Sequence, residues 1–173
     1  KTGNAMLQVC SPAALPDTGR STGASHVLTV MANVEQVARP VSVLPANHLK
    51  VSMDDITEHM DGFNAPCEAH VEQVLAFVRG WDRSAPMVVH CYAGISRSTA
   101  SAFAAACLLN PQKDEFSIAR QIRAASAIAQ PNRLIVSLAD RLLGRDGRML
   151  RALEEMGPGS MMAEGRPFRI DLD

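Results

Sequence analysis

The chain has 173 residues, of which 47% are hydrophobic and 20% are charged, and its formal net charge is −1. This composition is ordinary for a globular protein, and the length suits one domain with a sizeable core. The nearly balanced charge does not indicate a basic surface, so we expect no nucleic-acid partner. No apolar run approaches the roughly 20 residues of a membrane span, so we expect no membrane association. Four cysteines without regular spacing argue against a disulfide framework and favour a reducing cytoplasm.

The first half of the chain predicts three strands and one short helix. The strands are expected over residues 6–10, 26–31 and 48–53, where apolar and β-branched side chains dominate or alternate. Between the first two strands, Ser11 as the N-cap and Pro12 in the first turn predict a short helix.

The second half of the chain predicts a helix over residues 66–81 and a buried strand over residues 87–89. Further helices are expected over residues 98–109, 114–125, 132–143 and 146–156. Asn132 is expected to be the N-cap of one of them. The alternating tail, residues 167–172, is compatible with an edge strand. The elements together predict an α/β fold, in which a central sheet of four or five strands is flanked by helices.

A strand, a tight loop and a helix meet in residues 88–100, which read V-V-H-C-Y-A-G-I-S-R-S-T-A. A loop that ends at a helix N-terminus directs backbone N–H groups into one concavity, which binds a tetrahedral dianion. Gly94 lets the backbone turn where a side chain would clash. Arg97 can hold two phosphate oxygens with its planar guanidinium. The same donors favour the thiolate form of Cys91, so the stretch predicts a nucleophile beneath an oxyanion site.

At these residues the sequence resembles the cysteine-dependent protein tyrosine phosphatases. Their signature, His-Cys-x5-Arg-Ser/Thr, is matched by His90, Cys91, Arg97 and Ser98. The letters A-G-I-S-R-S are most similar to the compact dual-specificity branch of bacterial type. The alternative is a buried cysteine that merely ends a core strand, but it leaves Arg97 and the small-residue loop unexplained.

The resemblance implies a phosphotyrosine phosphatase-like fold and one phosphatase domain over residues 1–173. Its core would span about 6–144, with a C-terminal extension over 145–173. It also implies a phosphorylated protein or peptide as substrate, a phosphate or sulfate ion in the loop, and no cofactor or metal. Phosphotyrosine is the expected target, with phosphoserine and phosphothreonine as further candidates, because the loop lacks the lysines of phosphoinositide-directed relatives. The oligomeric state is not indicated.

The resemblance assigns roles to the residues of the signature. Cys91 is the expected nucleophile, Ser98 donates to its sulfur, and His90 organises the loop rather than transferring protons. The expected phosphate-binding residues are those of the loop, namely Tyr92, Ala93, Gly94, Ile95, Ser96 and Arg97.

Asp55 is the expected general acid, because the leaving oxygen of a phosphomonoester needs a proton. Similar enzymes carry this aspartate on a mobile loop upstream of the signature, just past a strand end. The stretch between Asp55 and Cys91 has room for one helix and one strand, so the loop can return to the pocket. Asp54 and Asp61 are the alternatives, as is a plain pair of solvated carboxylates. The sequence lacks the Trp-Pro-Asp loop of the larger tyrosine-specific enzymes.

Two other functions remain open from the sequence. A rhodanese-like sulfur transferase uses a similar loop, although it has no need of an upstream acid. A phosphate-binding pseudophosphatase keeps the anion pocket without catalysis, but the presence of Cys91, Arg97 and Asp55 argues against it.

Overall fold

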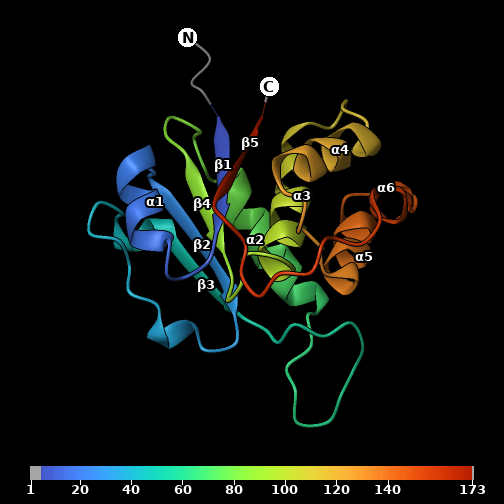
Figure 1. The fold of residues 1–173 in the computed structure, drawn as a ribbon, viewed down its shortest axis with the longest axis horizontal. Coiled ribbons are helices and arrows are strands. Elements are labelled where there is room, and N and C mark those ends of the chain that lie inside the picture. The colour runs from blue at the N-terminus through green and yellow to red at the C-terminus, as the bar shows by residue number, and fades with distance from the viewer. Residues whose placement is uncertain (1–4, 173) are drawn as a thin grey trace.

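A five-stranded sheet with the strand order β3-β2-β4-β1-β5 forms the centre of the fold in the computed structural model, which describes residues 5–172 (Figure 1). The first four strands pair in parallel, and β5 pairs antiparallel with β1. The strands are β1 (Met6–Cys10), β2 (His26–Met31), β3 (His48–Ser52), β4 (Met87–His90) and β5 (Phe168–Asp171). The predicted α/β fold with a four- or five-stranded sheet is therefore confirmed, while residues 1–4 and 173 of the predicted domain lie outside the described residues.

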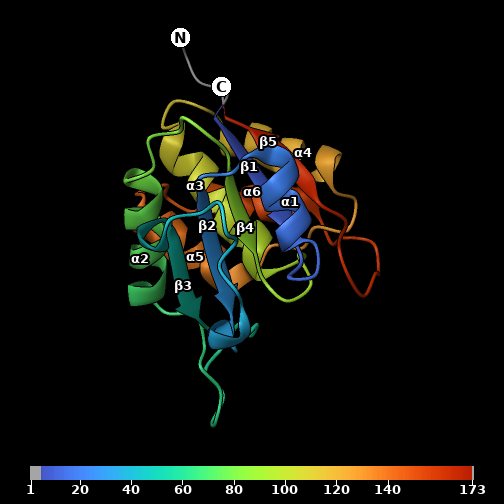
Figure 2. The same cartoon turned by 90° about the vertical axis from the view of Figure 1, so that its left-hand side faces the viewer.

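Helices cover both faces of the sheet, with α1 on one face and the longer helices grouped on the other (Figures 1 and 2). The helices are α1 (Leu15–Thr22), α2 (Glu68–Arg79), α3 (Arg97–Leu109), α4 (Glu115–Ala125), α5 (Arg133–Leu142) and α6 (Arg148–Met156). Two short 3-10 turns, Val34–Gln36 and Pro45–Asn47, lie before β3. Within residues 5–172, none of the helices has both the length and the apolar character needed to cross a membrane.

The first helix begins later than predicted. Ser11 does not cap it, because residues 12–14 first form a turn in which the backbone N–H of Ala14 donates to the carbonyl of Ser11 at 3.2 Å. The helix starts at Leu15, and Pro16 rather than Pro12 occupies its first turn. Both prolines suit a position without a free N–H, so the sequence pattern alone did not distinguish them.

The position of α3 follows from its alanines. Ala100, Ala102 and residues 104–106 are fully buried, and α3 contacts β1, β2 and β4. Small side chains allow a helix to approach a sheet closely, and tight packing leaves little room for the helix to shift. The N-terminus of α3 is thereby fixed at the end of β4.

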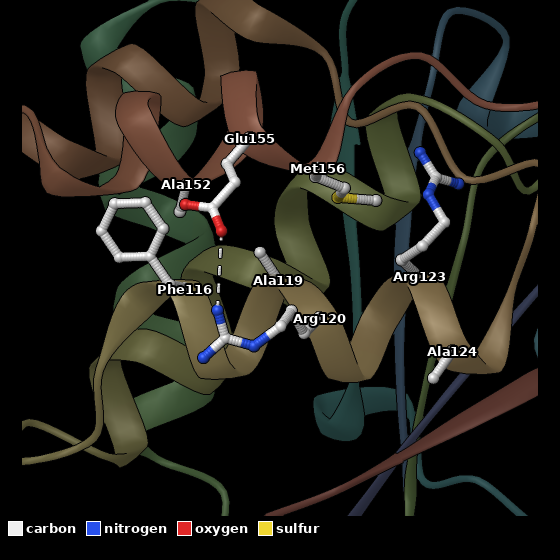
Figure 3. Close-up of a pocket in the computed structure, with 8 residues that line it drawn as sticks. All are labelled: Phe116, Ala119, Arg120, Arg123, Ala124, Ala152, Glu155 and Met156. Atoms are coloured by element: carbon white, nitrogen blue, oxygen red, sulfur yellow. Dashed lines mark ion pairs between the residues drawn. The ribbon is translucent and has the colours of Figure 1, made fainter.

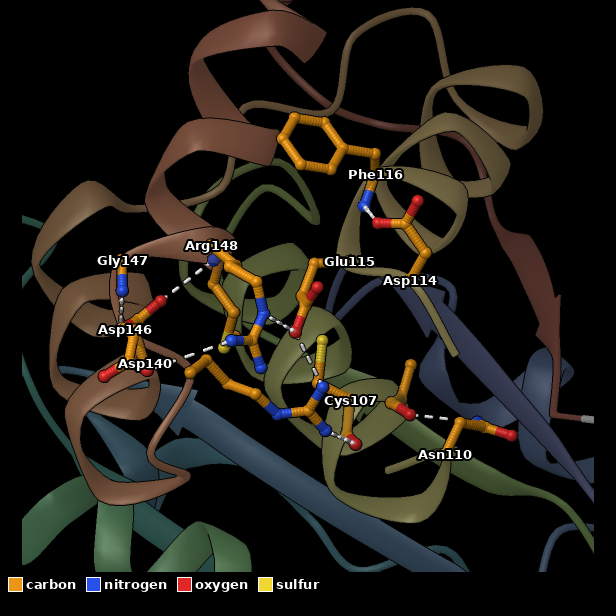
Figure 4. A network of polar contacts seen from close by, with 12 residues as sticks. Cys107, Asn110, Asp114, Glu115, Phe116, Asp140, Asp146, Gly147 and Arg148 are labelled. Atoms are coloured by element: carbon orange, nitrogen blue, oxygen red, sulfur yellow. Dashed lines mark hydrogen bonds and ion pairs between the residues drawn. The ribbon is translucent and has the colours of Figure 1, made fainter. Parts of the chain in front are cut away.

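A buried polar network attaches the C-terminal part of the chain to the helices before it (Figure 4). The carboxylate of Glu115 accepts hydrogen bonds from Arg145 at 2.8 Å and Arg148 at 3.1 Å. Burial alone would raise the pKa of Glu115, but these hydrogen bonds outweigh it and lower that pKa. Asp140 accepts from the backbone N–H of Met149 at 2.8 Å. These bonds fix the start of α6, and therefore the direction in which the chain continues toward β5.

Candidate active site

The loop between β4 and α3, residues 91–96, starts where three parallel strands end. His90 is paired with Cys10 on β1 and with Thr29 on β2. The carboxyl ends of the strands therefore meet beside Cys91, at the edge where open α/β sheets bind their ligands. The first backbone turn of α3 follows at Arg97.

The thiol of Cys91 lies under hydrogen-bond donors of its own loop. Its side chain is buried, with 2% exposed. The sulfur lies 3.1 Å from the hydroxyl of Ser98 and accepts a hydrogen bond from the backbone N–H of Gly94 at 3.3 Å. Donors directed at the sulfur favour negative charge on it, as a nucleophile of this kind requires.

Gly94 is needed because the loop passes directly against the end of β1. Its φ is +73°, a conformation that disfavours side chains. A Cβ at this position would also lie 3.0 Å from the carbonyl carbon of Cys10. The close approach and the positive φ together exclude other residues, and they hold the Gly94 N–H toward the sulfur.

One nitrogen of the Arg97 guanidinium is hydrogen-bonded to the backbone, and another has no partner within residues 5–172. Its Nη1 donates to the carbonyl of Met53 at 2.8 Å. Its Nε is buried and has no hydrogen-bond partner within residues 5–172. Leaving a buried donor unpaired costs about 1–3 kcal/mol, which an anion in the site would recover. Arg97 lines a cavity of about 210 Å³ together with Asp54, Asp55 and Tyr92.

Two polar side chains hold Asp55 against the catalytic loop. Its Oδ1 accepts hydrogen bonds from the hydroxyl of Ser96 at 2.7 Å and from Nδ2 of Asn132 at 2.8 Å. The neighbouring Asp54 has a different environment, since its Oδ2 accepts from the backbone N–H of Asn64 at 2.7 Å and so closes its own loop. Asp55 is therefore the carboxylate that the structure brings to the predicted site.

Two further polar residues considered from the sequence, Asn132 and Asp61, lie in different places relative to Asp55. Asn132 does cap α5, since its Oδ1 accepts from the backbone N–H of Ile135 at 3.0 Å, but its amide also reaches Asp55. The expected cap is therefore present, and the same side chain makes a second contact at the site. Asp61, the third candidate for the acid, is fully exposed beside His59 and belongs to the outer part of the loop.

His90 belongs to a chain of hydrogen bonds that sequence reasoning missed. Its Nδ1 lies 3.2 Å from the carbonyl of Cys91, and its Nε2 lies 2.7 Å from the hydroxyl of Thr29. That hydroxyl also lies 2.8 Å from Nε2 of His48. Burial lowers the pKa of His90 to about 4, so the ring is neutral at neutral pH. The signal available was a polar residue, Thr29, between the apolar residues Leu28 and Val30.

The carbonyl of Cys91, at one end of this series of hydrogen bonds, determines where the protons lie. A carbonyl only accepts, so Nδ1 of His90 carries the hydrogen and Nε2 has a lone pair. The hydroxyl of Thr29 must then donate to His90 and accept from Nε2 of His48. Burial, with smaller contributions from nearby positive charges, lowers the pKa of His48 to about 4 as well. These hydrogen bonds thus fix one tautomer of His90, and that tautomer holds the carbonyl of Cys91 in place.

Two further cysteines, Cys10 and Cys107, are also buried. Burial raises the pKa of Cys10 and that of Cys107 to about 12. Both therefore remain protonated thiols at neutral pH and are poor nucleophiles.

A cavity of about 470 Å³ lies away from this site, between α4 and α6 (Figure 3). It is lined by Phe116, Met156 and alanines, and an ion pair of 3.7 Å joins Arg120 to Glu155 beside it. No residue of the signature lines it. The position of reactive groups, rather than cavity size, therefore identifies the candidate site.

Comparison with known proteins places this geometry in a family. The profile described as protein-tyrosine phosphatase matches residues 38–130. Among solved structures, the PTP-2 phosphatase of Cydia pomonella superposes with a TM-score of 0.61 at 19% identity, covering 78% of this chain and 84% of that chain. Human DUSP28 superposes with a TM-score of 0.60 at 20% identity, covering 80% and 88%. A mouse putative dual specificity phosphatase, complexed with zinc tungstate, superposes with a TM-score of 0.59 at 18% identity, covering 84% and 86%.

At these identities the structural matches show a shared fold. A search of curated sequences finds no significant match. The family profile covers more than half of the chain and includes the whole signature from His90 to Ser98. The chain therefore belongs to the protein-tyrosine phosphatase family, as the resemblance of its signature implied.

Proposed function

We propose that this protein hydrolyses phosphomonoesters through a thiophosphate intermediate on Cys91, with phosphotyrosine in proteins as its main target. Phosphoserine and phosphothreonine are further candidate targets. One observation carries the proposal: the loop and the first turn of α3 hold a buried sulfur that faces hydrogen-bond donors and a buried guanidinium whose Nε has no partner within residues 5–172. A tetrahedral phosphate above the sulfur would satisfy that donor.

In the first step, the thiolate of Cys91 attacks phosphorus, forming the sulfur–phosphorus bond as the bond to the leaving oxygen breaks. Asp55, as the carboxylic acid, gives its proton to that oxygen. The guanidinium of Arg97 and the N–H groups of residues 92–97 stabilise the charge on the equatorial oxygens. The mouse neighbour was crystallised in a complex with zinc tungstate, and tungstate, like phosphate, is a tetrahedral oxyanion, which supports oxyanion binding by this chain.

In the second step, water attacks phosphorus and Asp55 takes up its proton. The sulfur–phosphorus bond breaks and phosphate leaves. The Ser98 hydroxyl and the N–H of Gly94 stabilise the thiolate that is released, since both lie within hydrogen-bond distance of its sulfur. His90 transfers no proton in this scheme, because it is buried and its hydrogen bonds go to Thr29 and the Cys91 carbonyl.

Asp55 is preferred to Asp54 as the acid because of what each carboxylate contacts. Ser96 belongs to the catalytic loop, and its bond to Asp55 keeps that carboxylate beside the cavity. Asn132 holds the same oxygen from α5, so it acts as a positioning residue. Asp54 is instead engaged with the backbone of Asn64. We further propose that residues 1–173 form one phosphatase domain.

The proposal is tested with phenyl phosphate as a small substrate. Cys91→Ser should abolish turnover while still binding a phosphate mimic such as vanadate or tungstate. Asp55→Asn should lower kcat by about 100-fold or more and remove the basic-side limb of its pH profile, the usual scale for a lost general acid. Asp54→Asn is the matched control and should retain most activity. Substantial turnover by Cys91→Ser would refute the nucleophile, and turnover of thiosulfate in place of phenyl phosphate would favour a sulfur transferase.

A further inference from the structure

We propose that residues 157–166, which join α6 to β5, form one side of the substrate-binding surface. Met161 and Met162 would contact an apolar side chain next to the phosphorylated residue of a protein substrate. The inference rests on the proposed phosphatase function and specifies which sequences that active site prefers.

The first end of this segment is fastened to the loop that follows α4. Nη2 of Arg123 donates to the carbonyl of Gly157 at 2.9 Å, and the backbone N–H of Ser160 donates to the carbonyl of Ala127 at 3.0 Å. Arg123 also donates to the carbonyl of Ala127 at 2.9 Å. The half-buried side chain of Arg123 therefore ties the end of α4 to the start of the segment.

The other end is fastened to the catalytic loop itself. The backbone N–H of Gly165 donates to the carbonyl of Ala93 at 2.8 Å. A Cβ on Gly165 would lie 3.0 Å from the carbonyl oxygen of Gly94, and a Cβ on Gly159 would lie 2.4 Å from that of Ile128. Glycine at both positions thus allows the backbones to touch. The segment is held at both ends, with residues 161–164 projecting between them.

The segment lines two cavities, each of which shares a residue with the cavity beside Arg97, here called the catalytic cavity. A cavity of about 260 Å³ is formed by Met161 and Met162 together with Asp55 and Ser96. Another, of about 400 Å³, is formed by Ala163, Glu164, Pro12, Ala13 and Tyr92. The catalytic cavity shares Asp55 with the first and Tyr92 with the second. The three cavities therefore adjoin, and a peptide with its phosphorylated side chain in the catalytic cavity has neighbouring residues over the other two.

The chemistry of this rim selects an apolar neighbour. Met161 is 97% exposed, Met162 is 56% exposed and Tyr92 is 71% exposed, so three large hydrophobic side chains are exposed along these adjoining cavities. Methionine side chains are flexible and polarisable, and they adapt to varied apolar partners. Glu164 adds a carboxylate at the same rim, which disfavours an acidic residue beside the phosphorylated one. The expected substrate is a phosphorylated peptide with an apolar residue close to the phosphate.

The test measures peptide binding to the proposed surface separately from catalytic turnover. Fluorescent phosphotyrosine peptides are bound to the Cys91→Ser variant, with leucine or aspartate placed in turn at each position flanking the phosphotyrosine. We expect leucine to bind about 10-fold more tightly than aspartate at one or two positions, the usual effect of an apolar side chain in a matching site. Met161→Glu and Met162→Glu in the same background should abolish that preference. Val41→Glu, a fully exposed apolar residue that lines none of the three cavities, is the control.

In the active enzyme, the ratio of kcat/KM for the leucine peptide to kcat/KM for phenyl phosphate should fall about 10-fold in the methionine variants. A ratio that stays at the wild-type value, or that falls equally in Val41→Glu, would overturn the inference. So would methionine-dependent binding to phosphatidylcholine vesicles with unchanged peptide preference, since it would assign these side chains to a lipid surface. Failure of the wild type to hydrolyse phenyl phosphate would refute the proposed function alone, because peptide binding by Cys91→Ser needs no turnover.

Discussion

Replacing Thr29 by valine tests whether the buried chain of hydrogen bonds holds the nucleophile. Valine is branched at Cβ like threonine and has nearly its shape, but it has no hydroxyl to place at this fully buried position. The change removes the 2.7 Å contact to His90 and the 2.8 Å contact to His48. The Nε2 atoms of both histidines then lose their partner in the interior.

The expected cost follows from the two groups left without partners. A buried polar group without its hydrogen bond costs about 1–3 kcal/mol, and His90 has no access to water to recover it. His48 is only half-buried and regains part of its loss by hydration. We therefore expect Thr29→Val to lower the free energy of unfolding by about 2–4 kcal/mol. Thr29→Ser keeps the hydroxyl and loses one methyl group, at a cost of about 1 kcal/mol.

Urea unfolding at neutral pH measures both variants against the wild type. The rate at which iodoacetamide alkylates Cys91 in the folded protein is a second readout. Without the Thr29 hydroxyl, the tautomer of His90 that donates to the Cys91 carbonyl is no longer fixed. We expect slower alkylation in Thr29→Val and a nearly unchanged rate in Thr29→Ser. If valine were as well tolerated as serine in both assays, the hydroxyl would not be holding His90, and the argument would be wrong.

Three further predictions concern stability. Burial lowers the pKa of His90 from 6.5 to about 4, so between these values the unfolded chain binds a proton that the folded protein does not. The free energy of unfolding should therefore decrease as pH falls, by about 2 kcal/mol from this group between pH 7.5 and pH 4.5, and a flat urea profile would contradict it. Glu115→Gln leaves a buried guanidinium without its charge partner and should cost about 3–5 kcal/mol, whereas Glu154→Gln, from an exposed pair, should cost under about 1 kcal/mol. Gly159→Ala should lower Tm more than Gly80→Ala, because a Cβ on Gly159 would lie 2.4 Å from the carbonyl oxygen of Ile128, whereas one on Gly80 would lie 3.7 Å from its nearest carbonyl oxygens, in ordinary contact.

Sequence patterns located the strands and helices because their signals are local. The buried strands around Leu7, Leu28 and Val89 read as short apolar runs, and the helices read as three- and four-residue periods. The start of α1 was misplaced, since two prolines competed for its first turn. Contacts between strands, such as that of Thr29 with His90, depend on the sheet register, which the periodicity of a single segment does not reveal.

The sequence by itself located the proposed nucleophile, the arginine and the loop between them, because these residues lie within one short stretch joining a strand to a helix. Only the tertiary structure decided which aspartate meets that loop, which hydroxyl fixes His90, and which late segment borders the opening. Those arrangements join residues far apart in the chain, and their distances are set by strand pairing and by the close packing of alanine-rich α3 against the sheet.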